Sequence, residues 1–222
     1  MPRAALKPRT APLQFEAELI AQGLRIVAGV DEAGRGAWAG PVVAGAVCLP
    51  LHDPELPYAL NGLTDSKQLS AAARTEYADQ IRVVALGWGV GEASAAEIDE
   101  IGILRATCAA MTRALEALYA TLPAGTPDAI LLDHIHWRGA PLNRPWKSLV
   151  RGDSRSLSIA AASVLAKTHR DAHMVALDTS FPGYGFAAHK GYGTPEHQAA
   201  LASLGKTEVH RLSFAPLRPT LL

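Results

Sequence analysis

The chain has 222 residues, is 49% hydrophobic and 19% charged, and balances 21 basic against 21 acidic residues. This composition predicts one folded domain with a sizeable core and excludes a disordered polyelectrolyte, and the zero net charge does not announce a nucleic-acid partner. We expect no membrane partner, because no segment approaches roughly 18 uninterrupted apolar residues and the N-terminus lacks the apolar stretch of a secretory signal. Cys48 and Cys108 lie among apolar residues, which predicts free buried thiols and a cytoplasmic location.

The predicted elements alternate after a flexible arm at 1–14, within a single domain at 15–222. In chain order they are helix 15–24, strands 25–31 and 42–49, helix 70–84 capped by Ser70, a strand within 83–90, helix 94–122 broken at Gly102, strands 129–132 and 148–150, helix 154–177, and a helical or irregular segment at about 178–222. The first two strands meet at a Gly-rich turn, which favours an antiparallel pair. The whole order predicts an α/β fold with a mixed β-sheet flanked by helices.

Three of the predicted strands end in carboxylates. Asp31 and Glu32 end the first strand, Asp133 follows 129–132, and Asp153 follows 148–150. In α/β folds functional groups gather at strand ends, because loops open there while the sheet holds them rigid. Taken one at a time, Asp133 is equally explained as an ordinary loop residue, and Asp153 as the N-cap of the following helix. Together they indicate a carboxylate site.

A carboxylate cluster needs cations, because like charges persist together only when they are protonated or neutralised. Mg²⁺ and Mn²⁺ prefer oxygen ligands, and two such ions about 4 Å apart can activate water for phosphodiester hydrolysis. The segment from His134 to Arg170 adds seven basic residues around one acid, Asp153. This local basic field suits a phosphate-attracting site, and a solvated basic face is the alternative.

The Gly-rich loop from Gly34 to Gly40 follows the first carboxylates. Adjacent strand residues point to opposite faces, so Asp31 and Glu32 reach one site only if the pleat breaks, and we expect Gly34 and Gly36 to allow that break. A dinucleotide site is not indicated, because the third glycine is misplaced and a strand follows where a helix is required. We interpret the loop as exposed backbone that approaches a polar ligand, with a turn needed only for the fold as the alternative.

Several blocks of the sequence resemble the ribonuclease HII family. They extend in the family's order from about Ile26 to Pro216. The blocks are Asp31-Glu32-Ala33-Gly34-Arg35-Gly36 with Gly40-Pro41-Val42-Val43, Asp65-Ser66-Lys67-Gln68-Leu69-Ser70, Glu97-Ile98-Asp99 with Ile103-Leu104-Arg105-Ala106-Thr107, the run from Gly152-Asp153-Ser154 to Ser163 with Lys167 and Arg170-Asp171, and His189-Lys190-Gly191-Tyr192-Gly193-Thr194 with His197, His210-Arg211 and Pro216.

This resemblance implies an RNase H-like fold and a catalytic site. The implied activity is endonucleolytic cleavage of RNA in RNA–DNA hybrids and of ribonucleotides embedded in duplex DNA, leaving a 5′-phosphate and a 3′-hydroxyl. Asp31, Glu32, Asp133 and Asp153 match the family's metal-binding acids. The implied cofactor is Mg²⁺ or Mn²⁺, with two ions at the site during catalysis.

The resemblance also implies how the substrate is read. The family reads the ribonucleotide 2′-OH through the backbone of the loop that matches Gly34-Arg35-Gly36, supported by a tyrosine that matches Tyr192. Only the 2′-OH separates RNA from DNA locally, and an aromatic stack tolerates any sequence. Lys67, Lys167 and Arg170 are then candidates for phosphate contacts, with ordinary solvated side chains as the alternative.

Some positions depart from the family's pattern. The loop after Asp133 reads His134-Ile135-His136-Trp137, where the family usually has a small residue followed by Gly or Asn, and Ala37 stands where Pro is common. Gly102 stands where Asn is common. None of these departures removes a candidate metal ligand.

Two other functions fit parts of the sequence. His169 and His173 have the i,i+4 spacing of zinc ligands on a helix, which would suit a zinc hydrolase, although Arg170 follows His169 where a zinc protease has Glu. A nucleic-acid-binding module without catalysis would use the basic field but not the acids. We expect a monomer, whose C-terminal end, Leu217 to Leu222, is either a docking tail for a replication factor or frayed.

Overall fold

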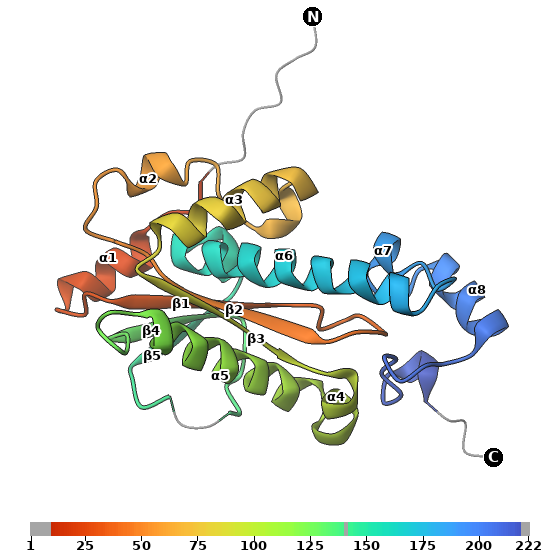
Figure 1. The fold of residues 1–222 in the computed structure, drawn as a ribbon. Helices are drawn as coiled ribbons and strands as arrows, with labels where there is room; N and C mark the ends of the chain where they lie inside the picture. The colour runs from red at the N-terminus through yellow and green to blue at the C-terminus, as the bar shows by residue number, and fades with distance from the viewer. Residues whose placement is uncertain (1–9, 140–141, 219–222) are drawn as a thin grey trace, which may run out of the picture.

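The computed structural model of the protein describes residues 10–139 and 142–218 and is built on one five-stranded sheet (Figure 1). The strand order is β3-β2-β1-β4-β5. The strands are β1 (Val27–Ala33), β2 (Val42–Cys48), β3 (Gly87–Ala93), β4 (Ala129–Asp133) and β5 (Trp146–Leu149). β1 pairs antiparallel with β2 and parallel with β4, which confirms the predicted mixed sheet and its first antiparallel pair.

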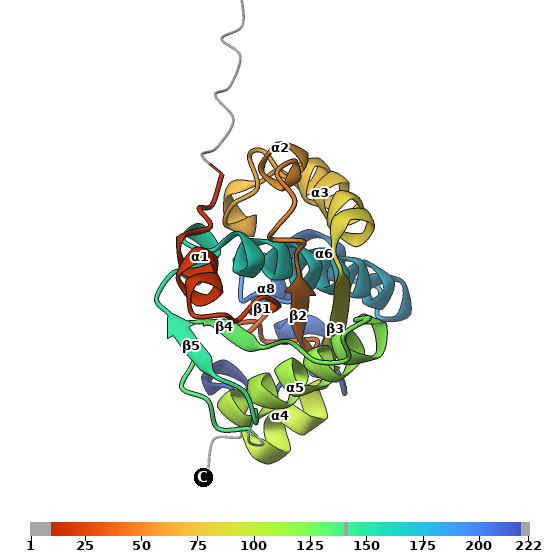
Figure 2. The ribbon, with the colours of Figure 1, turned by 90° about the vertical axis from the view of Figure 1, so that its left-hand side faces the viewer.

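Helices cover both faces of the sheet (Figure 2). One face carries α1 (Gln14–Ala21), α2 (Leu56–Ala59), α3 (Ala71–Val84) and the long α6 (Leu157–Ser180), and the other carries α4 (Ala95–Ile101) and α5 (Ile103–Thr121). Alternate apolar residues of β1 divide between the two cores, since Val30 packs with the α5 layer while Val27 packs with Ile159 of α6. The sheet is therefore buried on both sides, and its functional groups lie where the strands end.

Two strand glycines let α6 lie directly on the sheet backbone. A Cβ atom at Gly29 would stand 2.1 Å from the Ser158 carbonyl carbon, and one at Gly45 would stand 2.4 Å from the Ala162 carbonyl oxygen. No side chain fits in either place. The first half of α6 is thereby held at a fixed distance from β1 and β2.

The helix boundaries follow local capping. Ser70 accepts a hydrogen bond from the Ala73 N–H, as predicted, and the predicted break at Gly102 separates α4 from α5 with a φ of 80°. The helix predicted at 154–177 begins later, because residues 152–154 form a 3-10 turn and Ser156 caps α6 by accepting from the Ile159 N–H. The boundary between α3 and β3, which sequence could not place, lies at Ala85 and Leu86.

Residues at the end of the predicted N-terminal arm contact the domain. The Ala11 N–H donates to the Leu63 carbonyl, the Leu157 N–H donates to the Pro12 carbonyl, and Ala11 is buried. Residues 1–9 lie outside the described part of the chain.

The C-terminal segment forms a small layer at the far end of α6, with α7 (Phe186–His189), α8 (Pro195–Leu204) and a 3-10 turn at Ala215–Leu217 (Figure 1). A separate apolar cluster that includes Met174, Tyr184 and Phe186 holds it to α6. Over the described residues, no helix combines the length and apolarity needed to cross a bilayer.

Candidate active site

The predicted acids come from three neighbouring places at one edge of the sheet. Asp31 and Glu32 lie in β1, Asp133 ends the parallel strand β4, and Asp153 lies in the 3-10 turn before α6. Asp31 is buried and hydrogen bonds with Ser163 of α6. The fold thus brings together residues that are 122 positions apart in the sequence, from Asp31 to Asp153.

The predicted break in the pleat is absent. The pairing of β1 with β2 runs without interruption through Asp31, Glu32 and Ala33, which face Gly45, Ala44 and Val43. Glu32 is instead held by Arg35, whose guanidinium donates to its carboxylate at 3.0 Å. The glycines therefore turn the chain after the strand rather than within it.

Burial and mutual repulsion oppose ionisation of the acids in this cluster. Burial raises the pKa of Asp31 well above its ordinary value, and the charges of Glu32 and Asp133 raise it further. Burial likewise raises the pKa of Glu32, although Arg35 opposes the shift. The pKa of Asp153 rises to about 6 through burial and then through the charges of Asp65 and Asp133. Such pKa values mark carboxylates that lack a sufficient countercharge.

Asp65 belongs to this site but was not singled out from the sequence as a site residue. Its side chain accepts the Lys67 N–H, and its charge raises the pKa of Asp153. The Lys67 ammonium lies 3.9 Å from both Asp65 and Asp153. Burial lowers the pKa of Lys67, but the charges of Asp65 and Asp153 outweigh it and leave the pKa raised. Lys67 is thus a cation, 79% exposed, beside the acids.

The carboxylates are at present satisfied locally. Asp31 accepts its neighbour's N–H at 2.7 Å, and Asp133 accepts the Gly152 N–H at 2.5 Å. Over the described residues no three His, Cys, Asp or Glu side chains surround one point as the ligands of an ion do. The second carboxylate oxygen of Glu32, however, is buried without a hydrogen-bond partner in the described part of the chain. An all-oxygen donor set with an orphaned anionic oxygen fits a hard divalent cation.

Two hollows meet at Lys67 and divide the site into two halves. The first, of about 470 Å³, is lined by Asp65, Lys67, Asp133 and Asp153 among others, and we call it the acid half. The second, of about 530 Å³, is lined by Glu32 to Gly36, Ser66, Lys67, Ser163, Lys167 and Tyr192, and we call it the loop half. A bound chain that crosses Lys67 would contact both halves.

The two glycines of the predicted reading loop differ in what they do. Gly34 has a φ of 91°, and a Cβ there would stand 2.0 Å from Nε of Arg170. A Cβ at Gly36 would meet nothing within 4 Å, and its φ lies outside the left-handed region. The fold itself requires Gly34, whereas only something outside the protein would require Gly36.

Arg170, predicted as a phosphate contact, is fully buried. Its guanidinium donates to the carbonyls of Pro41 and Ala39 at 2.9 and 3.2 Å and lies 5.5 Å from the Tyr192 ring centre. This burial argues against a direct phosphate contact and makes Arg170 a support of the loop. Tyr192, 38% exposed, lies above it and lines the loop half.

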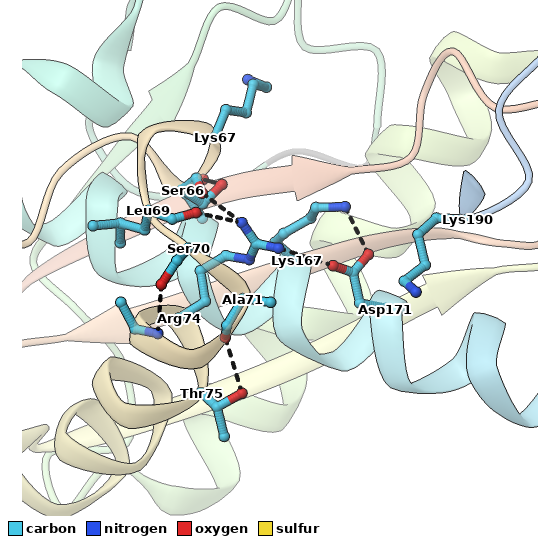
Figure 3. A network of polar contacts seen from close by, with 12 residues as sticks. Ser66, Lys67, Leu69, Ser70, Ala71, Arg74, Thr75, Lys167, Asp171 and Lys190 are labelled. Atoms are coloured by element: carbon cyan, nitrogen blue, oxygen red, sulfur yellow. Dashed lines mark hydrogen bonds and ion pairs between the residues drawn. The ribbon is translucent and has the colours of Figure 1, made fainter. Parts of the chain in front are cut away.

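Lys167 lines the loop half of the cleft and is held by an ion pair with Asp171 (Figure 3). Its ammonium pairs with Asp171 at 2.6 Å, and Asp171 also pairs with Arg74 at 3.4 Å. Arg74 in turn donates to the carbonyls of Ser66 and Leu69. The turn that carries Lys67 is therefore tied to α6 through charged groups from α3.

The zinc alternative finds no support in this geometry. His169 and His173 approach the same oxygen of Glu92 on β3 at 3.8 and 3.4 Å, as ordinary ion pairs of a half-exposed surface. His134 and His136 lie after β4 instead, and His134 lines the acid half. In the C-terminal layer, which the sequence did not single out as a site, His189 stacks on His197, and His210 lies tilted against His197.

Comparison with known proteins identifies the family. The family model described as Ribonuclease HII matches residues 28–217. The chain belongs to the ribonuclease HII family. A relative in this family, the ribonuclease HII of Syntrophotalea carbinolica, is 51% identical over 208 residues, which make up 94% of each chain. The chain is accordingly an endoribonuclease of the ribonuclease H type.

Solved structures confirm the RNase H-like fold. The structure of Bst-RNase HIII in complex with Mn²⁺ matches with a TM-score of 0.70 and 22% identity, over 86% of this chain and 68% of that one. The RNase HII in a PCNA:RNase HII complex from Archaeoglobus fulgidus matches with a TM-score of 0.65 and 24% identity, over 89% of this chain and 98% of that one.

Proposed function

We propose that the protein hydrolyses the RNA strand of RNA–DNA hybrids and nicks duplex DNA at embedded ribonucleotides. The observation that carries this proposal is the junction of the acid half and the loop half at Lys67. A phosphodiester placed over the acids would put its neighbouring ribose beside Gly36 and Tyr192. One half of the cleft then serves hydrolysis, and the other selects a 2′-OH.

Asp31, Glu32, Asp133 and Asp153 are the residues that would hold Mg²⁺ or Mn²⁺, with two ions as the number proposed for catalysis. The relative described as a Mn²⁺ complex supports this choice of ion class. When bound, such ions supply Lewis acidity and an activated water. The carboxylates would exchange their local N–H partners for the cations, and the raised pKa values of Asp31 and Asp153 reflect the countercharge that they lack.

In the hydrolysis, a water oxygen forms a bond to phosphorus and the bond from phosphorus to the 3′ oxygen breaks. The attacking water loses a proton, the leaving 3′ oxygen of the upstream piece takes one up and becomes a hydroxyl, and the downstream piece keeps the 5′-phosphate. Lys67 is close enough to the acids to neutralise phosphate charge, and Lys167 lies at the loop half. Tyr192 offers its ring to a sugar or base and its hydroxyl to a hydrogen bond.

The test uses a labelled DNA duplex with one ribonucleotide, incubated with Mg²⁺, Mn²⁺ or EDTA beside an all-DNA duplex and a long RNA–DNA hybrid. We expect metal-dependent nicking at the ribonucleotide and no cutting of DNA alone. Loss of single-ribonucleotide cleavage with retained hybrid cleavage would contradict the role given to the loop half. Cleavage of neither substrate by folded protein, or cleavage that persists in EDTA, would overturn the proposal.

We further infer a cytoplasmic monomer, in keeping with the buried free thiols of Cys48 and Cys108. Docking to a replication factor through the C-terminal tail is supported by the relative described in a complex with PCNA. Leu217 is buried, and its carbonyl accepts a hydrogen bond from Lys206, so Leu217 itself is not available for docking. Residues 219–222 of the predicted tail lie outside the described residues.

A further inference from the structure

The buried Arg211 orients one peptide of the reading loop. Its guanidinium donates to the carbonyls of Gly40 at 2.9 Å and Arg35 at 3.0 Å. In a trans peptide the N–H points away from the C=O, so the inward Arg35 carbonyl turns the Gly36 N–H outward. The Gly36 N–H has no hydrogen-bond partner among the described residues, and no protein atom would contact a Cβ at Gly36. Arg211 thus presents a free donor to the loop half.

The adjacent His210 begins a directed chain of hydrogen bonds that ends at Tyr192. The Tyr192 carbonyl can only accept, so Nδ1 of His197, 3.0 Å away, carries the hydrogen. Nε2 of a neutral His197 then accepts from Nε2 of His210 at 3.1 Å. Nδ1 of His210 is left as the acceptor of the Thr207 N–H at 3.0 Å. The three bonds agree on one neutral tautomer for each ring.

The Thr207 hydroxyl lies 2.8 Å from Nδ1 of His210 and can donate to it alongside the Thr207 N–H, which fits the same tautomer. Burial lowers the pKa of both His197 and His210. The charge of His189 lowers the pKa of His197 further, and the charge of Lys206 does the same for His210. No carboxylate contributes to the pKa shift of either imidazole. The stacked ring of His189 closes the other side, 4.5 Å from His197. The pair therefore stays neutral, and the chain keeps its direction.

We propose that His210 and Arg211 position the two groups that recognise the ribose. Arg211 orients the Gly36 N–H, and His210 holds the backbone of Tyr192 through His197. The inference rests on the proposed function. It adds that discrimination of a single ribonucleotide depends on two buried residues that touch no substrate. A purely structural role would affect the stability of the fold and cleavage of all substrates alike.

The experiment compares kcat/KM on a duplex with one ribonucleotide with kcat/KM on a long RNA–DNA hybrid. A long hybrid has many positions at which it can be cleaved, so an enzyme with a misplaced loop can still bind it productively. A duplex with a single ribonucleotide has only one such position. Arg211→Lys keeps the positive charge but cannot donate to the Gly40 and Arg35 carbonyls with the geometry of a guanidinium. His210→Asn keeps an acceptor for Thr207 and loses the donor to His197, whereas His210→Gln restores a donor at that position.

We expect Arg211→Lys and His210→Asn to lower the ratio of kcat/KM on the single ribonucleotide to kcat/KM on the hybrid roughly tenfold or more, since small misplacements of positioning groups reduce the rate by that much. His210→Gln should stay within about threefold of the wild type by the same scale. Leu118→Ala, in the buried core beneath β3, is the control for general destabilisation and should leave the ratio unchanged.

An unchanged ratio in folded Arg211→Lys and His210→Asn would overturn the inference, as would equal ratios for His210→Asn and His210→Gln. If Arg211→Lys fails to fold, the two His210 variants decide alone, because they leave Arg211 in place. Wild-type protein that cleaves neither substrate would instead refute the proposed function, so the two failures are distinct.

Discussion

The acid half and the loop half of the cleft are charged in opposite ways and built by different means. The acids lie together because β4 ends at Asp133, β1 carries Asp31 and the turn before α6 carries Asp153, and burial and repulsion raise the pKa values of Asp31 and Asp153. The loop half rests on two buried cations, Arg170 and Arg211, whose hydrogen bonds go to backbone carbonyls. The acid half is lined by the carboxylates of Asp65, Asp133 and Asp153 beside Lys67 and Arg151, whereas the loop half is supported from beneath by buried guanidinium groups.

Under the proposed function, this difference assigns chemistry and substrate selection to separate parts of the fold. The acids need only the sheet and the start of α6, whereas the loop also needs the C-terminal layer that carries Tyr192 and Arg211. Changes to the first half should abolish cleavage of every substrate. Changes to the second should alter which substrate is cut, and each prediction below tests that division.

The largest effect is expected from Asp31→Asn. Removal of one carboxylate from a metal-binding set should lower kcat at least about a thousandfold on both the hybrid and the single-ribonucleotide duplex. The free protein should become more stable to heat at pH 7, because a buried carboxylate with a raised pKa opposes folding once it ionises. Asp79→Asn, at an exposed position of α3, is the matched control. Retained cleavage would show that Asp31 is not a ligand.

Gly34→Ala and Gly36→Ala form a second, sharper test within the loop. Gly34→Ala should destabilise the fold by about 2 kcal/mol or more, because the residue has a left-handed φ and a Cβ would collide with Arg170. Gly36→Ala should leave the melting temperature within a degree or two, at roughly ±0.5 kcal/mol, yet hinder the approach of a ribose. Calorimetry with cleavage assays checks both. Equal melting temperatures for the two variants would contradict the separate roles.

Acid should weaken the loop half through its histidines. The pKa of His210 falls to about 4 in the fold from an ordinary 6.5, chiefly because of burial, so the unfolded chain binds a proton more readily. Stability from this residue is complete above pH 6.5 and is lost as pH falls toward 4, by at most about 3 kcal/mol.

Over the same pH range the buried acids change the free energy of unfolding in the opposite direction. The measurement therefore compares the free energy of unfolding of the wild type with that of His210→Gln, because both contain the same acids. Unfolding free energies of wild type and His210→Gln should converge as pH falls from 7 to 4. A gap between them that stays constant with pH would show that His210 does not titrate as the fold predicts.

Tyr192→Phe should give the smallest effect. The ring and its stacking surface remain, and only one hydroxyl hydrogen bond to substrate is lost. We expect kcat/KM on the single ribonucleotide to fall roughly threefold to tenfold, with a smaller change on the long hybrid. Tyr192→Ala should lower it further, because base or sugar stacking is then lost as well. Equal losses in the two variants would assign the whole effect to the hydroxyl.

Local signals predicted much of the fold. The Ser70 cap, the break at Gly102, the antiparallel first pair and the strand-end acids all depend on neighbouring residues or on short periodicities. Strand order does not, since β4 joins β1 only after 95 intervening residues, from Gly34 to Asp128. The sequence therefore indicated the acids but not how closely they associate.

The features that the sequence did not indicate have a common physical cause, which is long-range burial. A helical arginine such as Arg170 has the sequence appearance of a surface cation, and only the packing of a distant loop buries it. Asp65 joins the acids because Arg74 and Asp171 tie its turn to α6. The ordered start of the chain near Ala11 likewise depends on a partner at Leu63. None of these contacts has a signature within the segment itself.

The close contact of Gly29 and Gly45 with α6 has a consequence for sequence change. Because helix backbone touches strand backbone there, no rearrangement of side chains can absorb even one added methyl group. An alanine at Gly45 would displace α6 as a rigid rod, and Ser163, Lys167 and Arg170 would shift in the same direction together. A remote substitution could thus misalign both halves of the cleft at once, which makes these strand positions poor places for diversification in directed evolution.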